Sequence, residues 1–457
     1  MPRARWWVIG ALSVVTLLVV LLDATGVIFA EEAAPLPPPA VVVPALPDAA
    51  AAAPAAVEPE PVAADPRVVR DVEQALKSDA LGGSVHGFVA PLAEPASPWV
   101  DVDGAGLATP ASTLKLWTAT AALDAYAPQS RLETSVVWNA AAERLVLVGG
   151  GDATLTTDPD RAAGTASLAE LATATARALR REDVAAVRLG YDDGLFTGPA
   201  VSPAWEPTYV TSGVIAPVTA LMADQGRANP AGDARLPDPA LGAAESFAAL
   251  LEDAGVPVRG AVSQVTSPTS EPVASVSSPP MSDLVERMLR DSDNQLAESL
   301  GRMAALAQGK PGSFAGAVRA IEQAGADQGV DLGASDLYDA SGLSRDDTLP
   351  PQSLVEALHS ASAEPQLASI LSGLAVAGFD GTLADRFVVG DAAQGAGAVR
   401  AKTGTLTGIS AEAGVATTCD GSMLAYAFIA DDVVDTEAAR AALDDAAAVL
   451  ASCRWRR

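Results

Sequence analysis

The order in which helical and strand patterns follow one another limits the fold of this chain more than any other feature. Strand-like alternation occurs within residues 83–102 and again within 398–429, whereas helix and strand patterns alternate through the middle of the chain to about residue 270. Early strands and helices, a mixed middle, and late strands before a closing helix are typical of an interrupted core. We therefore expect an α+β fold that contains an inserted mixed α/β region.

The expected elements follow from periods of 3.6 residues for helices and 2 residues for strands. Pro110 stands just before one helical stretch, which is a favoured helix start. The helices are expected over residues 67–80, 111–126, 167–181, 243–254, 282–307 and 437–451, and the strands over 83–89, 98–102, 133–138, 144–148, 186–191, 398–403, 409–417 and 423–429.

The N-terminal segment has the composition of an export signal. Arg3 and Arg5 precede an uninterrupted apolar run over residues 6–22, so residues 1–30 are expected to be a cleaved signal peptide or an uncleaved membrane anchor. Residues 31–66 are rich in Pro, Ala and Glu and have no apolar face, which predicts a disordered tether. The folded part is then expected outside the cytoplasm, at the cell membrane or in the cell envelope.

Charge and rare side chains exclude some functions. The net charge is -28, which opposes binding to nucleic acid. The two histidines, His86 and His359, have no second His or Cys at metal-ligand spacing, so neither a metal site nor another cofactor is expected. Cys419 and Cys453 either form a disulfide in an oxidising compartment or are two separate buried thiols.

Ser112-Thr113-Leu114-Lys115 is the first of three short elements that carry chemistry. Residues three apart share one face of a helix, so the lysine amine is expected to reach the serine hydroxyl. A serine needs an adjacent base to become a nucleophile, and a lysine with a pKa lowered by burial and by a neighbouring cation can supply it. The alternative is a helix-capping serine followed by a solvated lysine.

Ser292-Asp293-Asn294 and Lys402-Thr403-Gly404-Thr405 are the other two elements. In the second element, the serine is suited to relay a proton and the asparagine to hold the lysine and the substrate backbone. The third is expected at the end of an edge strand, which can pair with an extended peptide. Its lysine would attract a carboxylate, its glycine would allow close approach, and its threonines would donate hydrogen bonds.

Lysine and asparagine are scarce in this chain, which makes the three elements more informative. There are only four lysines and three asparagines, and Lys115, Lys402 and Asn294 all lie within the elements. Ser-x-x-Lys, Ser-x-Asn and Lys-Thr-Gly in this order resemble the signature set of penicillin-binding proteins and serine β-lactamases. That resemblance implies a transpeptidase-like domain, an antiparallel sheet with helices.

The branch of this superfamily is indicated by the spacing of Ser112 and Ser292, which are 180 positions apart, far more than in a compact β-lactamase. The chain resembles the penicillin-binding protein 4 type of D-Ala-D-Ala carboxypeptidase/endopeptidase, peptidase family S13. The likeness covers residues 67–431 and includes the segments 147–152, 190–193, 205–209, 339–345 and 378–383. We expect the catalytic domain over residues 67–150 and 270–457 and the insert over 151–269.

The resemblance also implies roles for single residues. Ser112 would attack the carbonyl between two D-alanines with Lys115 as base, and Ser292 and Asn294 would complete the proton path. The backbone N–H groups of Ser112 and Thr405 would form the oxyanion hole. The terminal carboxylate would be bound by Lys402, Thr403 and Thr405. Expected partners are peptidoglycan peptides, β-lactam antibiotics as covalent inhibitors, and the membrane if residues 1–30 are retained.

Arg345 and Glu412 are two further residues that the resemblance singles out. Arg345 either receives the free carboxylate of a diaminopimelate side chain or is a surface arginine paired with Asp346 or Asp347. Glu412 stands where the family usually has an apolar residue. Two other functions are compatible with the sequence: a serine β-lactamase, and a non-catalytic envelope-binding protein with the same fold. A Ser-His-Asp hydrolase is disfavoured because no G-x-S-x-G is present.

Overall fold

The computed structural model describes residues 64–158, 160, 164–229, 232–268 and 270–452. The predicted signal or anchor, the predicted tether and Cys453 lie outside these residues. Within the described part of the chain, no helix is long and apolar enough to cross a membrane.

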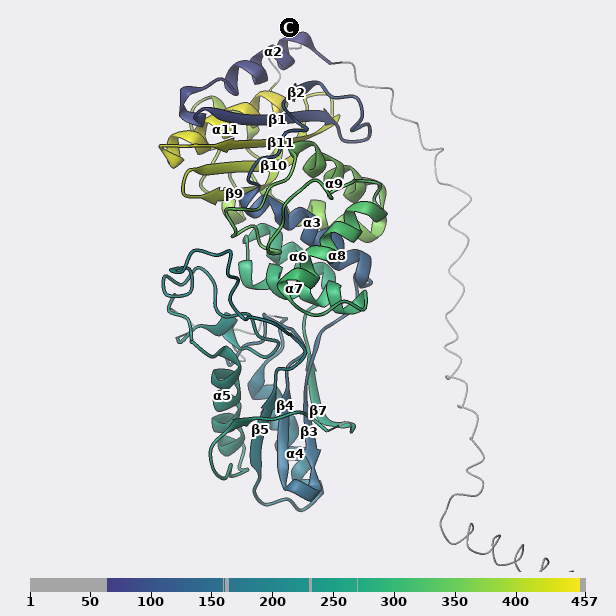
Figure 1. The fold of residues 1–457 in the computed structure, drawn as a ribbon, viewed down its shortest axis with the longest axis vertical. Helices are drawn as coiled ribbons and strands as arrows, with labels where there is room; N and C mark the ends of the chain where they lie inside the picture. Colours follow the sequence, from purple (N-terminus) through teal and green to yellow (C-terminus); the bar gives the residue numbers. More distant parts are fainter. Residues whose placement is uncertain (1–63, 159, 161–163, 230–231, 269, 453–457) are drawn as a thin grey trace, which may run out of the picture. The chain divides into compact units, whose positions relative to one another are not determined.

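A six-stranded antiparallel sheet joins the two ends of the described chain (Figure 1). The N-terminal strand β1 pairs along its whole length with β11, close to the C-terminus. Strand order is β2-β1-β11-β10-β9-β8, so the third motif on β9 lies near one edge, next to a two-residue strand. The strands are β1 (Ser84–Pro91), β2 (Val100–Val102), β8 (Ala375–Val376), β9 (Val399–Leu406), β10 (Ile409–Thr417) and β11 (Met423–Asp431).

Alternation along the central strands divides the core between the two faces of this sheet. On β11, Ala425, Ala427 and Ile429 pack into one apolar cluster with the helical block, whereas Tyr426 and Phe428 pack into another with α2 and α11. Figure 1 shows α11 on one side of the sheet and the helical block around α3 on the other. The helices are α2 (Pro66–Ala75), α3 (Lys115–Ala125), α6 (Met281–Arg290), α7 (Asn294–Ala307), α8 (Phe314–Asp327), α9 (Pro351–Ala363), α10 (Ala368–Ser372) and α11 (Thr436–Ala451).

A second, five-stranded mixed sheet has the order β6-β5-β4-β3-β7. Its apolar side packs against α4 and α5 around Leu145, Leu147, Leu189 and Phe247. Strands expected in the catalytic domain, β3 and β4, pair here instead, as does β7, so this sheet extends beyond the predicted 151–269 insert on both sides. The elements are β3 (Glu133–Asn139), β4 (Arg144–Val148), β5 (Arg188–Asp192), β6 (Ser263–Gln264), β7 (Pro272–Ser277), α4 (Leu168–Arg181) and α5 (Pro239–Asp253).

Candidate active site

The nucleophile motif lies on a tight turn that leads into α3. Residues 111–114 form a 3-10 turn, and α3 begins at Lys115. Side chains three apart eclipse one another in a 3-10 helix, which brings Lys115 directly over Ser112. Ala111, immediately before the serine, has a φ of 47°. A non-glycine residue in the left-handed region is strained, and such strain is common at functional sites.

Lys115 is fully buried and donates to three acceptors. Its Nζ lies 2.8 Å from Ser112 Oγ, 2.8 Å from Asn294 Oδ1 and 2.6 Å from the carbonyl oxygen of Ser341. An ammonium has three hydrogens, so all three contacts are satisfied in the protonated form. In the neutral form, the hydrogen toward Ser112 is replaced by a lone pair that can accept the serine proton.

Asp339 fixes the loop that supplies one of these acceptors. Its buried carboxylate accepts hydrogen bonds from the backbone N–H groups of Ser341 and Ser344, at 2.9 and 2.8 Å, and from that of Gly342. The indole Nε1 of Trp205 also donates to it, at 2.7 Å. This carboxylate therefore holds the Ser341 carbonyl in place below Lys115, and it links the segments 205–209 and 339–345.

The second and third motifs meet through Ser292 and Lys402. Lys402 on β9 is fully buried, and its Nζ donates to Ser292 Oγ at 2.9 Å and to the Thr403 carbonyl at 2.6 Å. Ser292 has a φ of 55° in the break between α6 and α7, which the sequence predicts as one helical block. That break turns Ser292 toward β9, while Asn294 begins α7 and reaches Lys115.

Two glycines allow the backbone at Ser112 to be enclosed. A Cβ on Gly404 would lie 2.8 Å from the Pro110 carbonyl oxygen and 3.0 Å from the Ser112 nitrogen. A Cβ on Gly342, which has a φ of 74°, would lie 1.8 Å from the Ala111 carbonyl oxygen. The sequence predicts that Gly404 allows close approach of a peptide. In the structure, the absence of a Cβ on Gly404 makes room for the turn that carries Ser112.

Burial is the main influence on the charge of both lysines. It lowers the pKa of Lys115 to about 8, against the opposing negative charges of Asp339, Glu298 and Asp293. Burial also lowers the pKa of Lys402 well below its usual range, and the positive charges of Lys115 and Arg386 add to this effect. The sequence predicts two causes for a low pKa of Lys115, namely burial and a neighbouring cation. Burial dominates, and the charge of Lys402 is not among the main influences on the pKa of Lys115.

The pKa of Lys115 predicts how the rate depends on pH. Below about 8 the amine is protonated and cannot accept the Ser112 proton; above it, the amine is neutral and can. The second-order rate constant for acylation by a penicillin should rise about tenfold per pH unit between pH 6 and 7.5 and level off above 8. Stopped-flow or mass-spectrometric acylation rates measure this, and a flat profile from pH 6 to 9 would contradict the assignment of Lys115 as base.

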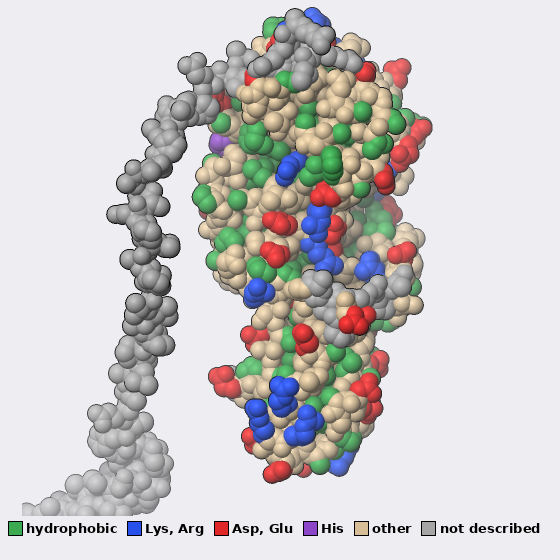
Figure 2. All heavy atoms as spheres, turned by 180° about the vertical axis from the view of Figure 1, so that it is seen from behind, with side chains coloured by type: hydrophobic (Ala, Val, Ile, Leu, Met, Phe, Trp, Pro, Cys, Tyr) green, Lys and Arg blue, Asp and Glu red, His purple; other side chains and the backbone are tan. Residues whose placement is uncertain are grey.

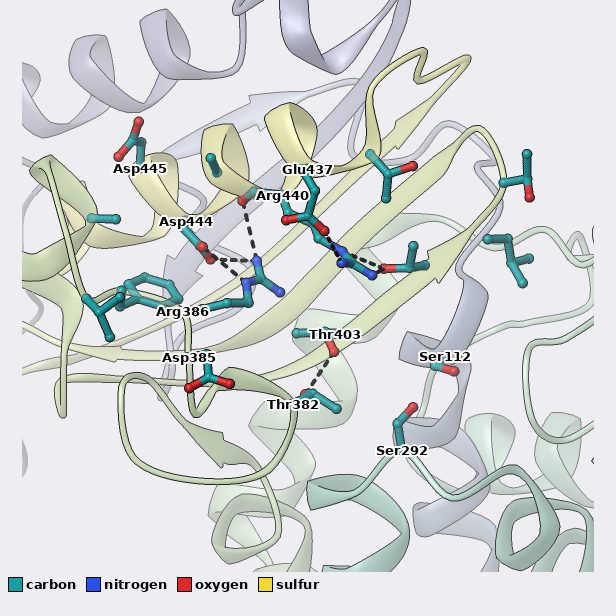
Figure 3. Close-up of a pocket in the computed structure, with 18 of the residues that line it drawn as sticks. Ser112, Ser292, Thr382, Asp385, Arg386, Thr403, Glu437, Arg440, Asp444 and Asp445 are labelled. Atoms are coloured by element: carbon teal, nitrogen blue, oxygen red, sulfur yellow. Dashed lines mark hydrogen bonds and ion pairs between the residues drawn. The ribbon is translucent and has the colours of Figure 1, made fainter. Parts of the chain in front are cut away.

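A cleft of about 1250 Å³ opens over this constellation. It is lined by five of the predicted residues, namely Ser112, Ser292, Asn294, Thr403 and Thr405. Figure 3 shows the side chains of Ser112 and Ser292 directed toward the same space, with Thr403 on the adjacent strand. The two lysines lie beneath these residues and contact them.

Arg345 is the predicted site residue that the structure does not bring into this lining. Its side chain is exposed, and among the described residues it forms no ion pair with Asp346 or Asp347. Its positive charge does act on Tyr209, which lines the cleft. A role for Arg345 in substrate binding therefore stays a hypothesis.

Arg440 on α11 is a cleft residue that the sequence analysis missed. Its Nη2 and Nε lie 3.3 and 3.4 Å from Thr405 Oγ1, and its Nη1 pairs with the exposed Glu437 at 2.6 Å (Figure 3). An exposed pair of this kind contributes little, so the guanidinium can turn to another anion. Nothing local distinguishes Arg440 in the sequence, because its contact with Thr405 depends on how α11 packs on the sheet.

Arg386 holds one wall of the cleft against two carboxylates. Its Nη2 lies 2.7 Å from Glu412 Oε2 and 2.5 Å from Asp444 Oδ1. Glu412 is fully buried on β10, and Tyr426 donates its hydroxyl to it at 2.7 Å. The unusual acid noted in the sequence therefore faces α11 and anchors the loop between β8 and β9. Burial and the charge of Glu412 raise the pKa of Asp444 to about 7.

Comparison with known proteins places the chain in a family. A sequence model of the D-Ala-D-Ala carboxypeptidase 3 (S13) family matches residues 68–237 and 232–453. The carboxypeptidase DacB of Mycolicibacterium smegmatis is 35% identical over 430 residues, which are 89% of this chain and 91% of that protein. The chain belongs to the S13 family of D-Ala-D-Ala carboxypeptidases. The predicted family and the predicted class of enzyme, a serine carboxypeptidase, are thereby confirmed.

More distant relatives agree with this assignment. A D-alanyl-D-alanine carboxypeptidase of Actinomadura sp. is 27% identical over 75% of this chain and 77% of its own length. The crystal structure of penicillin-binding protein 4 from Haemophilus influenzae matches 82% of this chain and 97% of that one, with a TM-score of 0.67 and 22% identity. This likeness confirms the predicted fold class, an α+β fold with a penicillin-binding domain.

Proposed function

We propose that this S13 carboxypeptidase hydrolyses the terminal D-Ala-D-Ala bond of peptidoglycan stem peptides through an acyl-enzyme on Ser112. The observation that carries the proposal is the 2.8 Å contact between Ser112 Oγ and Lys115 Nζ at the floor of the cleft. The buried lysine has a pKa of about 8, low enough to leave part of it neutral near physiological pH.

The reaction follows from this arrangement. Neutral Lys115 accepts the proton of Ser112 as Oγ attacks the carbonyl carbon, and the backbone N–H groups of Ser112 and Thr405 stabilise the oxyanion. The proton then passes, with Ser292 and Asn294 along its path, to the leaving amine, and the C–N bond breaks to release D-alanine. Water, deprotonated by the same route, hydrolyses the ester and restores Ser112.

The substrate carboxylate has a matching set of groups. Thr403 and Thr405 line the cleft beside Ser112, Lys402 lies beneath them, and Arg440 adds a guanidinium at Thr405. Charge-assisted hydrogen bonds of this kind are strong and orient a terminal carboxylate. β-Lactams carry a carboxylate and a reactive amide in a similar relation, so we propose that they acylate the same serine. A related structure from Haemophilus influenzae, 22% identical, is described as complexed with a β-lactam.

The location that we propose is the outer face of the cell membrane or the cell envelope. Arg3, Arg5 and the apolar run over residues 6–22 support export, and the Pro-rich residues 31–66 support a tether between that segment and the enzyme. An acyl-transfer enzyme for peptidoglycan peptides would meet its substrate there.

Product analysis tests the proposed reaction. The purified protein is incubated with a stem pentapeptide ending in D-Ala-D-Ala and, separately, with a crosslinked peptide dimer. We expect release of free D-alanine from the pentapeptide by the native protein and none by Ser112→Ala. Cleavage of the dimer would add endopeptidase activity. Absence of D-alanine release by folded native protein would reject the carboxypeptidase proposal, and rapid turnover of nitrocefin would favour a β-lactamase instead.

A further inference from the structure

A buried glutamate lies on the same face of α7 as Asn294. Figure 2 shows acidic side chains spread over one face of the molecule, where solvent surrounds them. Glu298, in contrast, is fully buried. Residues four apart share one face of a helix, so Glu298 lies one turn after the asparagine that binds Lys115, and Arg302 lies one turn further. A buried charge is costly unless it is paired and hydrogen-bonded, so its partners show what it does.

Glu298 binds the loop that receives the Lys115 amine. Its Oε1 accepts a hydrogen bond from the Ala340 N–H at 3.0 Å. The Ala340 carbonyl accepts from the Thr118 hydroxyl at 2.6 Å, and the carbonyl of the next residue, Ser341, accepts from Lys115 Nζ at 2.6 Å. Both backbone groups of the residue just before the lysine's acceptor are therefore fixed by buried side chains, one on α7 and one on α3.

Arg302 balances this carboxylate inside the protein. Its Nη1 lies 2.9 Å from Glu298 Oε2, and both side chains are at most 1% exposed. Its Cζ lies 4.0 Å from the centre of the Phe314 ring and 5.7 Å from that of the Phe196 ring. A cation over an aromatic face is stabilised electrostatically. The guanidinium is therefore held between Glu298 and these two rings.

Stability alone does not account for a buried ion pair at this place. Two charges lose their hydration on burial, and an apolar pair of similar volume is often as stable or more stable. The charge of Glu298 does affect Lys115: burial lowers the pKa of the lysine to about 8, and the negative charges of Asp339 and Glu298 oppose that decrease. Burial and the charge of Asp339 raise the pKa of Glu298, whereas Arg302 favours its ionised form.

Other charged groups face the amine of the base from the elements packed around it. Asp293 precedes α7, Asp339 and Asp347 belong to the loop, and Lys402 lies on β9. Asp339 holds the loop through backbone N–H groups and Asp293 caps α7, so replacing either disturbs the site. Burial and the charge of Asp339 raise the pKa of Asp347 well above its ordinary value. Glu298, by contrast, can lose its charge and keep its hydrogen bond to the loop if it becomes glutamine.

From these contacts we infer that Glu298 is a positioning residue for acylation, which fixes the loop that receives the Lys115 amine and favours the protonated form of that amine by its charge. This role rests on the proposed function, in which Lys115 is the base. Arg302 would keep Glu298 ionised. Together the two side chains would set the pH at which the amine becomes free to accept the Ser112 proton.

Two double variants separate the effect of position from that of charge. Glu298→Gln/Arg302→Met keeps an acceptor for the Ala340 N–H and removes both charges, whereas Glu298→Met/Arg302→Met removes the acceptor as well. Replacing both members of the pair avoids leaving either charge buried alone. Glu252→Gln, which removes an exposed acid from α5, is the control for a change of charge. Thermal unfolding fixes the folded fraction of each protein.

The effect of charge is measured by titration of the lysine itself. The chain has only four lysines, so protein labelled with ¹³C at lysine Cε gives few NMR signals, and Lys115→Met assigns the relevant one. We expect its midpoint to move to lower pH by about half a pH unit in Glu298→Gln/Arg302→Met, and not to move in Glu252→Gln. If the double variant does not fold, Glu298→Gln alone should move the midpoint in the same direction by about one pH unit. An unchanged midpoint in a folded variant would overturn the role of the charge.

The effect of position is measured by the acylation rate at pH values above the midpoint. With a penicillin as the probe, we expect Glu298→Gln/Arg302→Met to remain within about twofold of the native rate and Glu298→Met/Arg302→Met to lose about tenfold, the effect of about one lost hydrogen bond. Equal rates for the two double variants would overturn the positioning role. Failure of the native protein to be acylated would instead reject the proposed function, and the lysine titration would still decide whether Glu298 acts on Lys115.

Discussion

Replacing Lys115 with methionine is expected to lower the rate of Ser112 acylation by about 10³-fold, within the range for loss of a general base. Methionine has a similar length and fills the buried space, but it cannot accept the serine proton. It also leaves Asn294 Oδ1 and the Ser341 carbonyl without the donor that they share. The rate is measured as covalent labelling by a fluorescent penicillin under single-turnover conditions.

The matched control for this variant is Lys77→Met. Lys77 is exposed and lies just after α2, outside the three motifs. Its replacement should leave the labelling rate within about twofold. Thermal unfolding establishes that both variants are folded. If Lys115→Met were folded and still labelled at close to the native rate, another group would have to be the base.

Replacing Arg386 with methionine is expected to destabilise the protein by about 3–5 kcal/mol, the cost of leaving a buried charge without its partner. Glu412 is fully buried, and Arg386 is its ion-pair partner at 2.7 Å. The same guanidinium also balances Asp444. The free energy of unfolding from urea denaturation measures the effect.

Two further variants make this prediction specific. Arg400→Met removes an exposed arginine from β9 and should change the free energy of unfolding by less than about 0.5 kcal/mol. Adding Glu412→Gln to Arg386→Met should recover part of the loss, because the uncompensated charge is removed while Tyr426 keeps a hydrogen-bond partner. A loss equal to that of Arg400→Met would show that Arg386 does not balance a buried charge.

Local patterns were sufficient to predict several elements and the main site contacts. β4 and β10 have the predicted bounds, because a short, largely apolar run bounded by turn residues identifies a buried strand. The contact of Ser112 with Lys115 follows from a spacing of three residues on one helical turn. In both cases the deciding interactions lie within a few residues in the sequence.

Features that depend on long-range packing were not predictable in this way. Periodicity shows that residues 133–148 form strands, but it does not show that these strands pair with β5 and β7 and not with the terminal sheet. The break at Ser292 interrupts a continuous apolar period and requires a positive φ that the sequence does not mark with glycine. Arg386 and Arg440 become cleft residues only because α11 packs against the sheet.

Covalent labelling by a penicillin reports which side chain is the nucleophile. The purified protein is treated with benzylpenicillin, digested and analysed by mass spectrometry. We expect one adduct with the mass of the intact penicillin on Ser112, and none in Ser112→Ala. An adduct on a different residue, or no adduct in folded protein, would contradict it.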